Sequence, residues 1–241
     1  MKIDWMKIHC FGDAPAAARG CAEYILEQMG AAIRERGSAA IAISGGSSPR
    51  PMFELFGKTP FAWEKTHIFW VDERAVPPTH SRSNFKLAAD MWLSPAKVPA
   101  ENIHRIEAER EPQEAARLYV EDLRRHFQIR EGEMPRFDVI HRGMGPDGHT
   151  ASLFPGSPLV RDRTGLAAAV WVETMCEWRI TLLPGVLEAA RRTAMLAAGA
   201  DKAAMLKAVI DGPYDPEQRP AQIRPADGEI DWFVDRAAQG G

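Results

Sequence analysis

Short apolar runs alternate along the chain with longer segments whose apolar residues recur at helical spacing. Runs typical of buried strands lie at 39–44, 167–172, 179–184 and 194–199, and two more open the segments 67–78 and 137–149. Helical patterns mark 14–36, 83–92, 112–127, 185–192 and 201–210, and another helix is expected to start after Pro49. The tail at 225–238 is expected to form a closing strand or a short helix. Strands that alternate with helices predict an α/β fold with a doubly wound, mainly parallel central sheet and helices on both faces.

The composition indicates one domain spanning residues 1–241. No low-complexity or Ser/Gly linker divides the chain, which is long enough for one large core. A net charge of −3 gives no basic field for nucleic acid or anionic lipid, so a local small-molecule site is expected. No segment approaches the roughly 18 to 20 apolar residues of a membrane span, and "MKIDWMKIHC" lacks the apolar run of a signal peptide. We expect a cytoplasmic monomer or weak homodimer.

The cysteines give no sign of a framework. Cys10, Cys21 and Cys176 are odd in number, far apart and without a CxxC pair. This pattern suggests neither disulfides nor a zinc site. We expect reduced thiols and no bound metal.

Polar, glycine-bearing segments follow several expected strands, where an open α/β sheet binds its ligands. The first is "SGGSSP", at 44–49. Gly45 and Gly46 permit a tight turn in which backbone N–H groups face an anion at a helix start, and Ser44 and Ser47 add hydroxyl donors. A helix cap after a turn explains the same residues, because the full Walker and dinucleotide patterns are absent.

The second segment, "VDERAVPPTHSRSN" at 71–84, places three charged residues at a strand end. Arg74 could present its planar guanidinium to a phosphate or a developing oxyanion, whereas Asp72 and its neighbours could equally form a solvated loop. Ser83 is expected to cap the next helix. The alternatives stay open on these residues alone.

The third segment, "RGMGPDGH", carries His149, whose usual pKa suits proton transfer near neutral pH. Asp147 lies close enough in sequence to bond a ring nitrogen of His149 and select its tautomer, or it makes an Asx-turn only. His141, at the strand end, is expected to be structural.

Two further cations lie at element starts. Arg179 begins an expected strand, and Lys202 lies in the first turn of an expected helix. A lysine at a helix start opposes the dipole preference, which indicates an anionic neighbour.

Taken together, "SGGSSP", "VDERAVPPTHSRSN", "GMGPDGHTASLFPG", "RITL" and "DKAAMLKAV" resemble the 6-phosphogluconolactonase family in order and spacing. The resemblance covers nearly the whole chain, and "GPDGHTASLFPG" is highly specific to the family. It implies a Rossmann-like fold shared with the glucosamine-6-phosphate deaminases. It also implies hydrolysis of 6-phospho-D-glucono-1,5-lactone to 6-phosphogluconate in the oxidative pentose phosphate pathway, without metal or organic cofactor.

The resemblance also implies roles for individual residues. His149 would act as general base on water and then as acid to the ring oxygen, oriented by Asp147. Arg74 would stabilise the oxyanion, with Asp72 holding Arg74 or a substrate hydroxyl. The substrate phosphate would lie among Ser44, Gly45, Gly46, Ser47, Arg179 and Lys202.

Two other functions are weighed against the lactonase. The deaminases usually carry a glutamate where Phe154 stands and Asp-Glu-Tyr where the chain has Asp-Glu-Arg74, so both positions favour the lactonase. A non-catalytic sugar-phosphate sensor would usually carry a helix-turn-helix domain, for which the chain has neither spare length nor a basic patch.

The chain also departs from the family pattern at two places. "HRG" at 141–143 stands where Leu-Leu-Gly is common and brings polar groups to a strand end near the site. "TMCEW" at 174–178 replaces a Pro-Lys-Pro-Pro-like stretch. The second departure changes the loop that presents Arg179.

Overall fold

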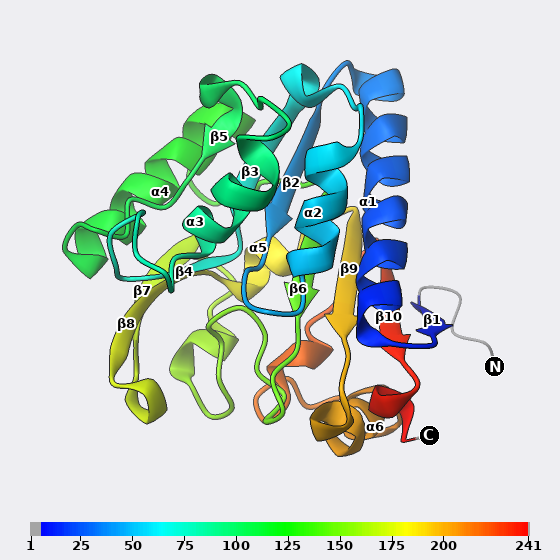
Figure 1. The fold of residues 1–241 in the computed structure, drawn as a ribbon. Helices are drawn as coiled ribbons and strands as arrows, with labels where there is room; N and C mark the ends of the chain where they lie inside the picture. The colour runs from blue at the N-terminus through cyan, green and yellow to red at the C-terminus, as the bar shows by residue number, and fades with distance from the viewer. Residues whose placement is uncertain (1–5, 241) are drawn as a thin grey trace.

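A computed structural model describes residues 6–240 of the chain. Residues 1–5, part of the segment in which no signal peptide is expected, and residue 241 lie outside the described residues. Within that range, a central sheet has the order β1-β10-β9-β6-β2-β3-β5 and every pairing in it is parallel (Figure 1). Its strands are β1 (Met6–Phe11), β2 (Ala39–Ile43), β3 (Thr66–Trp70), β5 (Ile103–His104), β6 (Val139–Gly143), β9 (Arg192–Ala197) and β10 (Glu229–Asp235).

A small antiparallel sheet lies below the carboxyl ends of the central strands in Figure 1. It has the order β4-β8-β7 and consists of β4 (Asp72–Arg74), β7 (Ala167–Val172) and β8 (Glu177–Leu182). The Leu182 amide donates to the Val71 carbonyl over 2.8 Å, just beyond the end of β3. The two sheets are therefore tied together where the strands of the larger one end.

The α-helices that surround the sheets are α1 (Ala14–Arg36), α2 (Arg50–Lys58), α3 (Asn84–Ala88), α4 (Pro112–Phe127), α5 (Pro184–Glu188) and α6 (Ala203–Asp211). The longest, α1, begins where the Asp13 side chain accepts a bond from the Ala16 amide and ends at Gly37, whose φ of 84° is left-handed. None of the helices in the described part of the chain is long and apolar enough to cross a membrane.

Helices cover both faces of the central sheet, as the alternation along β3 shows. Successive strand residues point to opposite faces. Phe69 packs against Phe127 of α4, whereas the neighbouring Trp70 packs against Phe85 of α3. The doubly wound, mainly parallel architecture expected from the sequence is confirmed.

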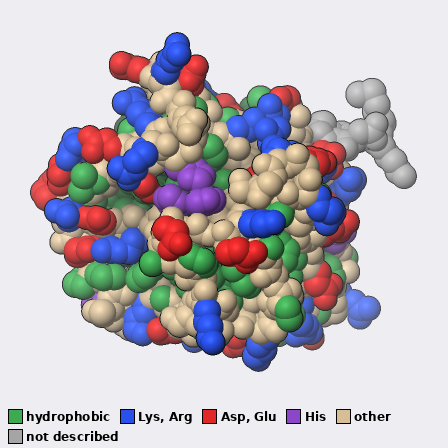
Figure 2. Space-filling view, turned by 90° about the horizontal axis from the view of Figure 1, so that it is seen from above, with side chains coloured by type: hydrophobic (Ala, Val, Ile, Leu, Met, Phe, Trp, Pro, Cys, Tyr) green, Lys and Arg blue, Asp and Glu red, His purple; other side chains and the backbone are tan. Residues whose placement is uncertain are grey.

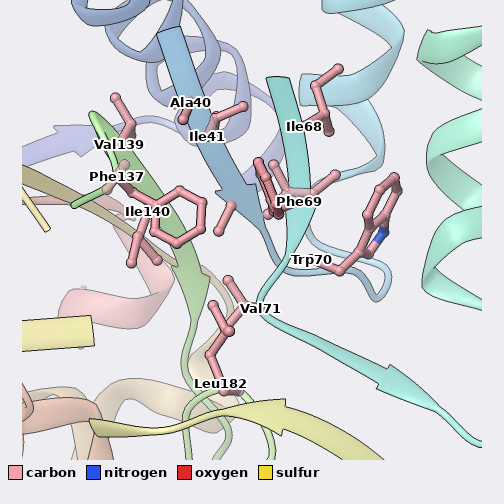
Figure 3. Packing of buried hydrophobic residues seen from close by; sticks show 14 of the residues in the cluster. Ala40, Ile41, Ile68, Phe69, Trp70, Val71, Phe137, Val139, Ile140 and Leu182 are labelled. Atoms are coloured by element: carbon pink, nitrogen blue, oxygen red, sulfur yellow. The ribbon is translucent and has the colours of Figure 1, made fainter. Parts of the chain in front are cut away.

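The core lies between these helices and the central strands. Figure 3 shows apolar side chains of β2, β3 and β6 packed together, with Val71 and Leu182 where the two sheets meet. All five residues of β2 are buried, because helices cover both of its faces. The carboxyl ends of these strands are thus held on a rigid base.

Tyr119 of α4 closes part of the sheet edge. Its hydroxyl donates to the Trp70 carbonyl over 2.6 Å and accepts from the Trp70 amide over 3.0 Å. The edge strand β5 pairs only with Ile68 and Phe69, so Tyr119 takes over the backbone groups beyond it.

Several boundaries differ from the sequence expectations. The strands β1, β4 and β5 were not expected, whereas the tail forms strand β10, which is one of the two forms expected for it. The helix expected at 83–92 divides into α3 and a π-helical turn at Ala89–Leu93, and α5 ends at Glu188 instead of continuing to 192. The helix expected at 201–210 begins with a 3₁₀ turn at Ala200–Lys202.

Candidate active site

The chain reverses its direction of travel across the sheet between β2 and β6. From β2 it proceeds outward through β3 to β5, and β6 then returns to the other side of β2. Such a switch leaves a crevice at the carboxyl ends of the two strands, where α/β proteins bind ligands. The segments that leave these two ends are 44–49 and 143–149, and the Ser44 amide bonds the His141 carbonyl across the gap.

A pocket opens at this switch point. The expected site residues that line it are Ser44, Gly45, Gly46, Ser47, Asp72, Arg74, His149, Arg179 and Lys202. Residues that the sequence did not assign to the site also line it, among them Asn84, His141, Gly145 and Ala151. Asp147 is absent from the lining and contacts the pocket through the ring of His149.

The imidazole of His149 is held in one orientation. Its Nδ1 lies 2.6 Å from Asp147 Oδ1, and the same oxygen accepts the His149 amide over 3.1 Å. The aspartate therefore makes the turn and also bonds the ring. Because a carboxylate only accepts, the proton of a neutral ring stays on Nδ1 and leaves a lone pair on Nε2.

The surroundings of His149 are shaped for that ring. Phe154 stacks on it, with 4.4 Å between ring centroids and 29° between planes. A Cβ at Gly145 would lie only 2.2 Å from ring atoms of His149, so glycine is required there. Ala151 takes a left-handed φ of 54° in the same loop, which is a strained conformation for alanine.

Arg74 lies in the pocket, and no carboxylate of the described residues pairs with it. Its Nη1 donates to Asn84 Oδ1 over 2.6 Å and to the Arg82 carbonyl over 2.7 Å. Both acceptors are neutral, so the guanidinium keeps its full charge toward the pocket. A Cβ on Gly45 would lie 2.0 Å from Asn84 Oδ1, so the glycine turn and Asn84 fit only together.

Glu73 anchors the loop that carries Arg74. Its buried carboxylate accepts from the amides of Arg74, Asn84 and Phe85 and from Ser83 Oγ, over 2.7 to 2.9 Å. Burial raises the pKa of Glu73, and these four donors oppose the rise. Ser83 also caps α3 by accepting the Lys86 amide, as expected from the sequence.

Asp72 faces Arg179 instead of Arg74. Its Oδ2 accepts from Ser152 Oγ over 2.7 Å and lies 3.8 Å from Arg179 Nη1. Of the two roles expected for Asp72, holding Arg74 is corrected, because Asn84 occupies that position, and contact with a substrate hydroxyl stays a prediction. Asp72 instead joins the His149 loop, through Ser152, to strand β8.

Arg179 is held by Glu177, which lies in the segment 174–178 that differs from the family pattern. Glu177 Oε1 accepts from Arg179 Nε over 2.9 Å and from Nη2 over 2.7 Å, and it is mostly buried. Arg82 also pairs with Glu177. Glu177 thus orients Arg179 and neutralises part of its charge at the pocket wall.

Lys202 supplies a further cation to the pocket. Burial lowers the pKa of Lys202, while Asp201 and Asp235 oppose that shift. Within residues 6–240 its ammonium has no hydrogen-bond partner, so an anionic ligand bound there would compensate its charge. The buried Ser44 hydroxyl and both ring nitrogens of His141 are likewise unpartnered at the pocket wall.

Sequence reasoning missed Asn84, Ser152 and Glu177 as site residues. Asn84 directly follows the expected cap Ser83, and its polar side chain at the end of a charged loop was the available signal. Ser152 and Glu177 act through contacts that only the tertiary fold creates.

The comparisons with known proteins agree with this fold and pocket. The family model described as "Glucosamine-6-phosphate isomerases/6-phosphogluconolactonase" matches residues 12–232, so the chain belongs to that family. A protein named 6-phosphogluconolactonase from Synechocystis sp. is 38% identical over 86% of each chain, and one from Nostoc sp. is 36% identical over 90% of each. A 6-phosphogluconolactonase structure from Thermotoga maritima superposes with a TM-score of 0.83 at 25% identity, covering 96% of this chain and 100% of that one.

Proposed function

We propose that the protein hydrolyses 6-phospho-D-glucono-1,5-lactone to 6-phosphogluconate, the lactonase step of the oxidative pentose phosphate pathway. One observation carries the proposal: the imidazole of His149 is fixed through Nδ1, and its Nε2 has no partner among residues 6–240, in a pocket that also holds three cations. The name 6-phosphogluconolactonase of relatives with similar length supports the choice of substrate.

The phosphate of the substrate binds at the 44–49 turn. Backbone amides and hydroxyls of Ser44, Gly45, Gly46 and Ser47 supply neutral donors, while Arg179 and Lys202 supply charge. Anchoring a dianion away from the reacting carbonyl supplies binding energy that positions the lactone for attack.

His149 moves the protons of the reaction. Its Nε2 takes a proton from water as the oxygen attacks the lactone carbonyl, and Arg74 stabilises the oxyanion of the tetrahedral intermediate. As the intermediate collapses, the bond between the carbonyl carbon and the ring oxygen breaks, and His149 returns the proton to that oxygen. The products are a carboxyl group, which ionises, and a free hydroxyl.

Phe154 and Arg74 favour this reaction over amino-sugar deamination. A ring-opening histidine needs a second polarising carboxylate, and the position next to His149 is filled by the Phe154 ring.

We also propose that the protein acts in the cytoplasm as a monomer or weak homodimer, without nucleic-acid or membrane partners, on the basis of its modest charge.

The test is a pH-stat or coupled assay on freshly made 6-phosphogluconolactone beside glucosamine-6-phosphate. We expect lactone hydrolysis at least about 100-fold above that of the His149→Ala variant, no release of ammonia and no effect of a chelator on the rate. Ammonia release without lactone hydrolysis would identify a deaminase. Background hydrolysis together with a sugar-phosphate-induced rise in Tm would identify a sensor.

A further inference from the structure

Three histidines from three separate elements meet far from the candidate active site. His67 lies near the start of β3, His104 on β5 and His126 in the last turn of α4. Figure 2 looks down on the end of the molecule where the central strands begin, and histidine side chains form a group at that surface. The lactone pocket lies at the opposite ends of these strands.

The ring nitrogens of these histidines converge. One nitrogen of each ring lies within 4.8 Å of the others, and His67 Nδ1 is 3.1 Å from His104 Nε2. Tetrahedral zinc with Zn–N bonds of about 2.0 to 2.1 Å places its ligand nitrogens roughly 3.3 Å apart. The pair already has that spacing, and a small rotation of the His126 side chain completes a three-nitrogen face.

A carboxylate prepares His104 for a metal. Asp122 Oδ2 lies 2.9 Å from His104 Nδ1, and its other oxygen accepts from Arg125 Nη2 over 2.6 Å. The proton of neutral His104 is therefore on Nδ1, and the lone pair of Nε2 points toward His67. Carboxylate–histidine pairs of this kind orient the ligands of zinc sites and raise their basicity.

Packing against Phe69 accounts for the position of the His104 and His126 rings but leaves their nitrogens free to point elsewhere. Packing against Phe69 therefore does not explain why the nitrogens of both rings converge with that of His67.

A route for the ion is present. His104 and Asp122 line a surface hollow together with Glu101 and Glu121. All three histidines are partly exposed, so water can reach a bound ion and supply a fourth ligand. Four carboxylates and two arginines, Arg105 and Arg125, line this hollow, so its net charge is negative and attracts cations.

We propose that His67, His104 and His126 bind one zinc ion with water as the fourth ligand, and that Asp122 orients His104. His67 needs only to move its own ring proton from Nδ1 to Nε2 when the ion enters. The ion joins the sheet edge formed by β3 and β5 to α4, so its role is structural and separate from lactone hydrolysis.

The experiment titrates chelator-treated full-length protein with Zn²⁺ against a competing chromophoric chelator, and repeats it with Co²⁺ to record the visible absorption of a tetrahedral site. We expect one ion per chain and a rise in Tm. His104→Ala and His126→Ala should each weaken binding at least about 100-fold, and Asp122→Asn about 10- to 100-fold while keeping the shape of the side chain.

His149→Ala is the matched control, because it removes a histidine at the lactone pocket. It should retain full zinc affinity and the zinc-induced rise in Tm. Failure to bind one ion at micromolar Zn²⁺, or loss of binding in His149→Ala with retention in Asp122→Asn and His126→Ala, overturns the proposal. The lactonase assay on the same samples reports on the proposed function independently.

Discussion

Phe154 and Asp147 divide the surroundings of His149 between them. The phenyl ring covers one face of the imidazole, and the carboxylate takes the proton-bearing nitrogen, so Nε2 is the position left for proton exchange. Gly145 completes the arrangement, since any side chain there would displace the ring. At the scale of single residues, the loop therefore commits His149 to one tautomer and one direction.

The first prediction concerns that histidine and its partner. We expect His149→Ala to lower kcat by about 10² to 10⁴ with little change in KM, because the proton transfer is lost while phosphate binding remains. Asp147→Asn should lower kcat less, since the ring keeps its place but loses control of its tautomer. Steady-state kinetics on the lactone measure both, and an unchanged kcat in His149→Ala would show that another group activates water.

The second prediction concerns the pair Glu177 and Arg179. Glu177→Gln keeps an acceptor for Arg179 but removes the negative charge that competes with a phosphate, so we expect KM to fall about threefold, more clearly at low salt. Arg179→Ala is the matched comparison and should raise KM with a smaller effect on kcat. A higher KM in Glu177→Gln would mean that the carboxylate charge helps to present Arg179.

At the scale of elements, the loop from β4 to α3 is organised around one buried carboxylate. Glu73 holds the amides of Arg74 and Asn84, and Asn84 in turn holds the Arg74 side chain. These bonds and the pairing with β8 supply hydrogen-bond partners for the three consecutive charged residues of β4, which stabilises the strand. Arg74, for which the sequence alone left a solvated loop open, is thus fixed at the pocket.

The third prediction follows from this anchor. Glu73→Gln should lower Tm by several degrees, since an amide offers one acceptor oxygen to four donors and leaves buried N–H groups unpaired. The loss of loop order should also lower kcat/KM through Arg74. Thermal unfolding and kinetics test the two effects separately, and Glu114→Gln on the exposed face of α4 is the control. An unchanged Tm would remove Glu73 as the anchor.

The elements that the sequence predicted well are those whose signals are local. Helix α1 has its cap at Asp13 and its stop at Gly37, and α4 has a regular apolar stripe, so both were predicted with their boundaries. Strands β4 and β5 are three and two residues long and lack such a stripe. Their pairing comes from tertiary neighbours, which is also why Asn84 and Glu177 escaped sequence reasoning.

At the scale of the whole molecule, the switch in strand order decides where the chemistry lies. Segments 44–49 and 143–149 are about a hundred residues apart, yet β2 and β6 are neighbours and bring their carboxyl ends together. The sequence predicted that convergence, because polar, glycine-bearing segments follow the expected strands. The histidine cluster at the other end escaped it, because no spacing pattern links His67, His104 and His126.

The fourth prediction concerns the acid stability of the whole fold. His141 is fully buried with unpartnered ring nitrogens, and burial lowers the pKa of His141 to about 3. Unfolded histidine titrates near pH 6.5, so between pH 6.5 and 3 the unfolded chain binds a proton that the folded chain excludes. Stability therefore falls as pH falls through this range, by up to about 1.4 kcal/mol per pH unit from this residue.

His141→Leu should remove that contribution. We expect the loss of unfolding free energy between pH 7 and pH 5 to be about 2 kcal/mol smaller in the variant than in the parent chain, whatever their absolute stabilities. Urea unfolding at the two pH values measures the difference. Equal losses in both chains would mean that His141 is protonated in the folded state.

The hydroxyl of Tyr119 has a consequence for how the protein behaves at high concentration. Trp70 pairs with Ile43 of β2 on one side, but the short edge strand β5 ends at Phe69 on the other, and open strand edges are templates on which chains associate into aggregates. By bonding both backbone groups of Trp70, one phenol from α4 removes that template. Colloidal solubility at this edge thus depends on a single oxygen atom, which a phenylalanine at the same position would lack.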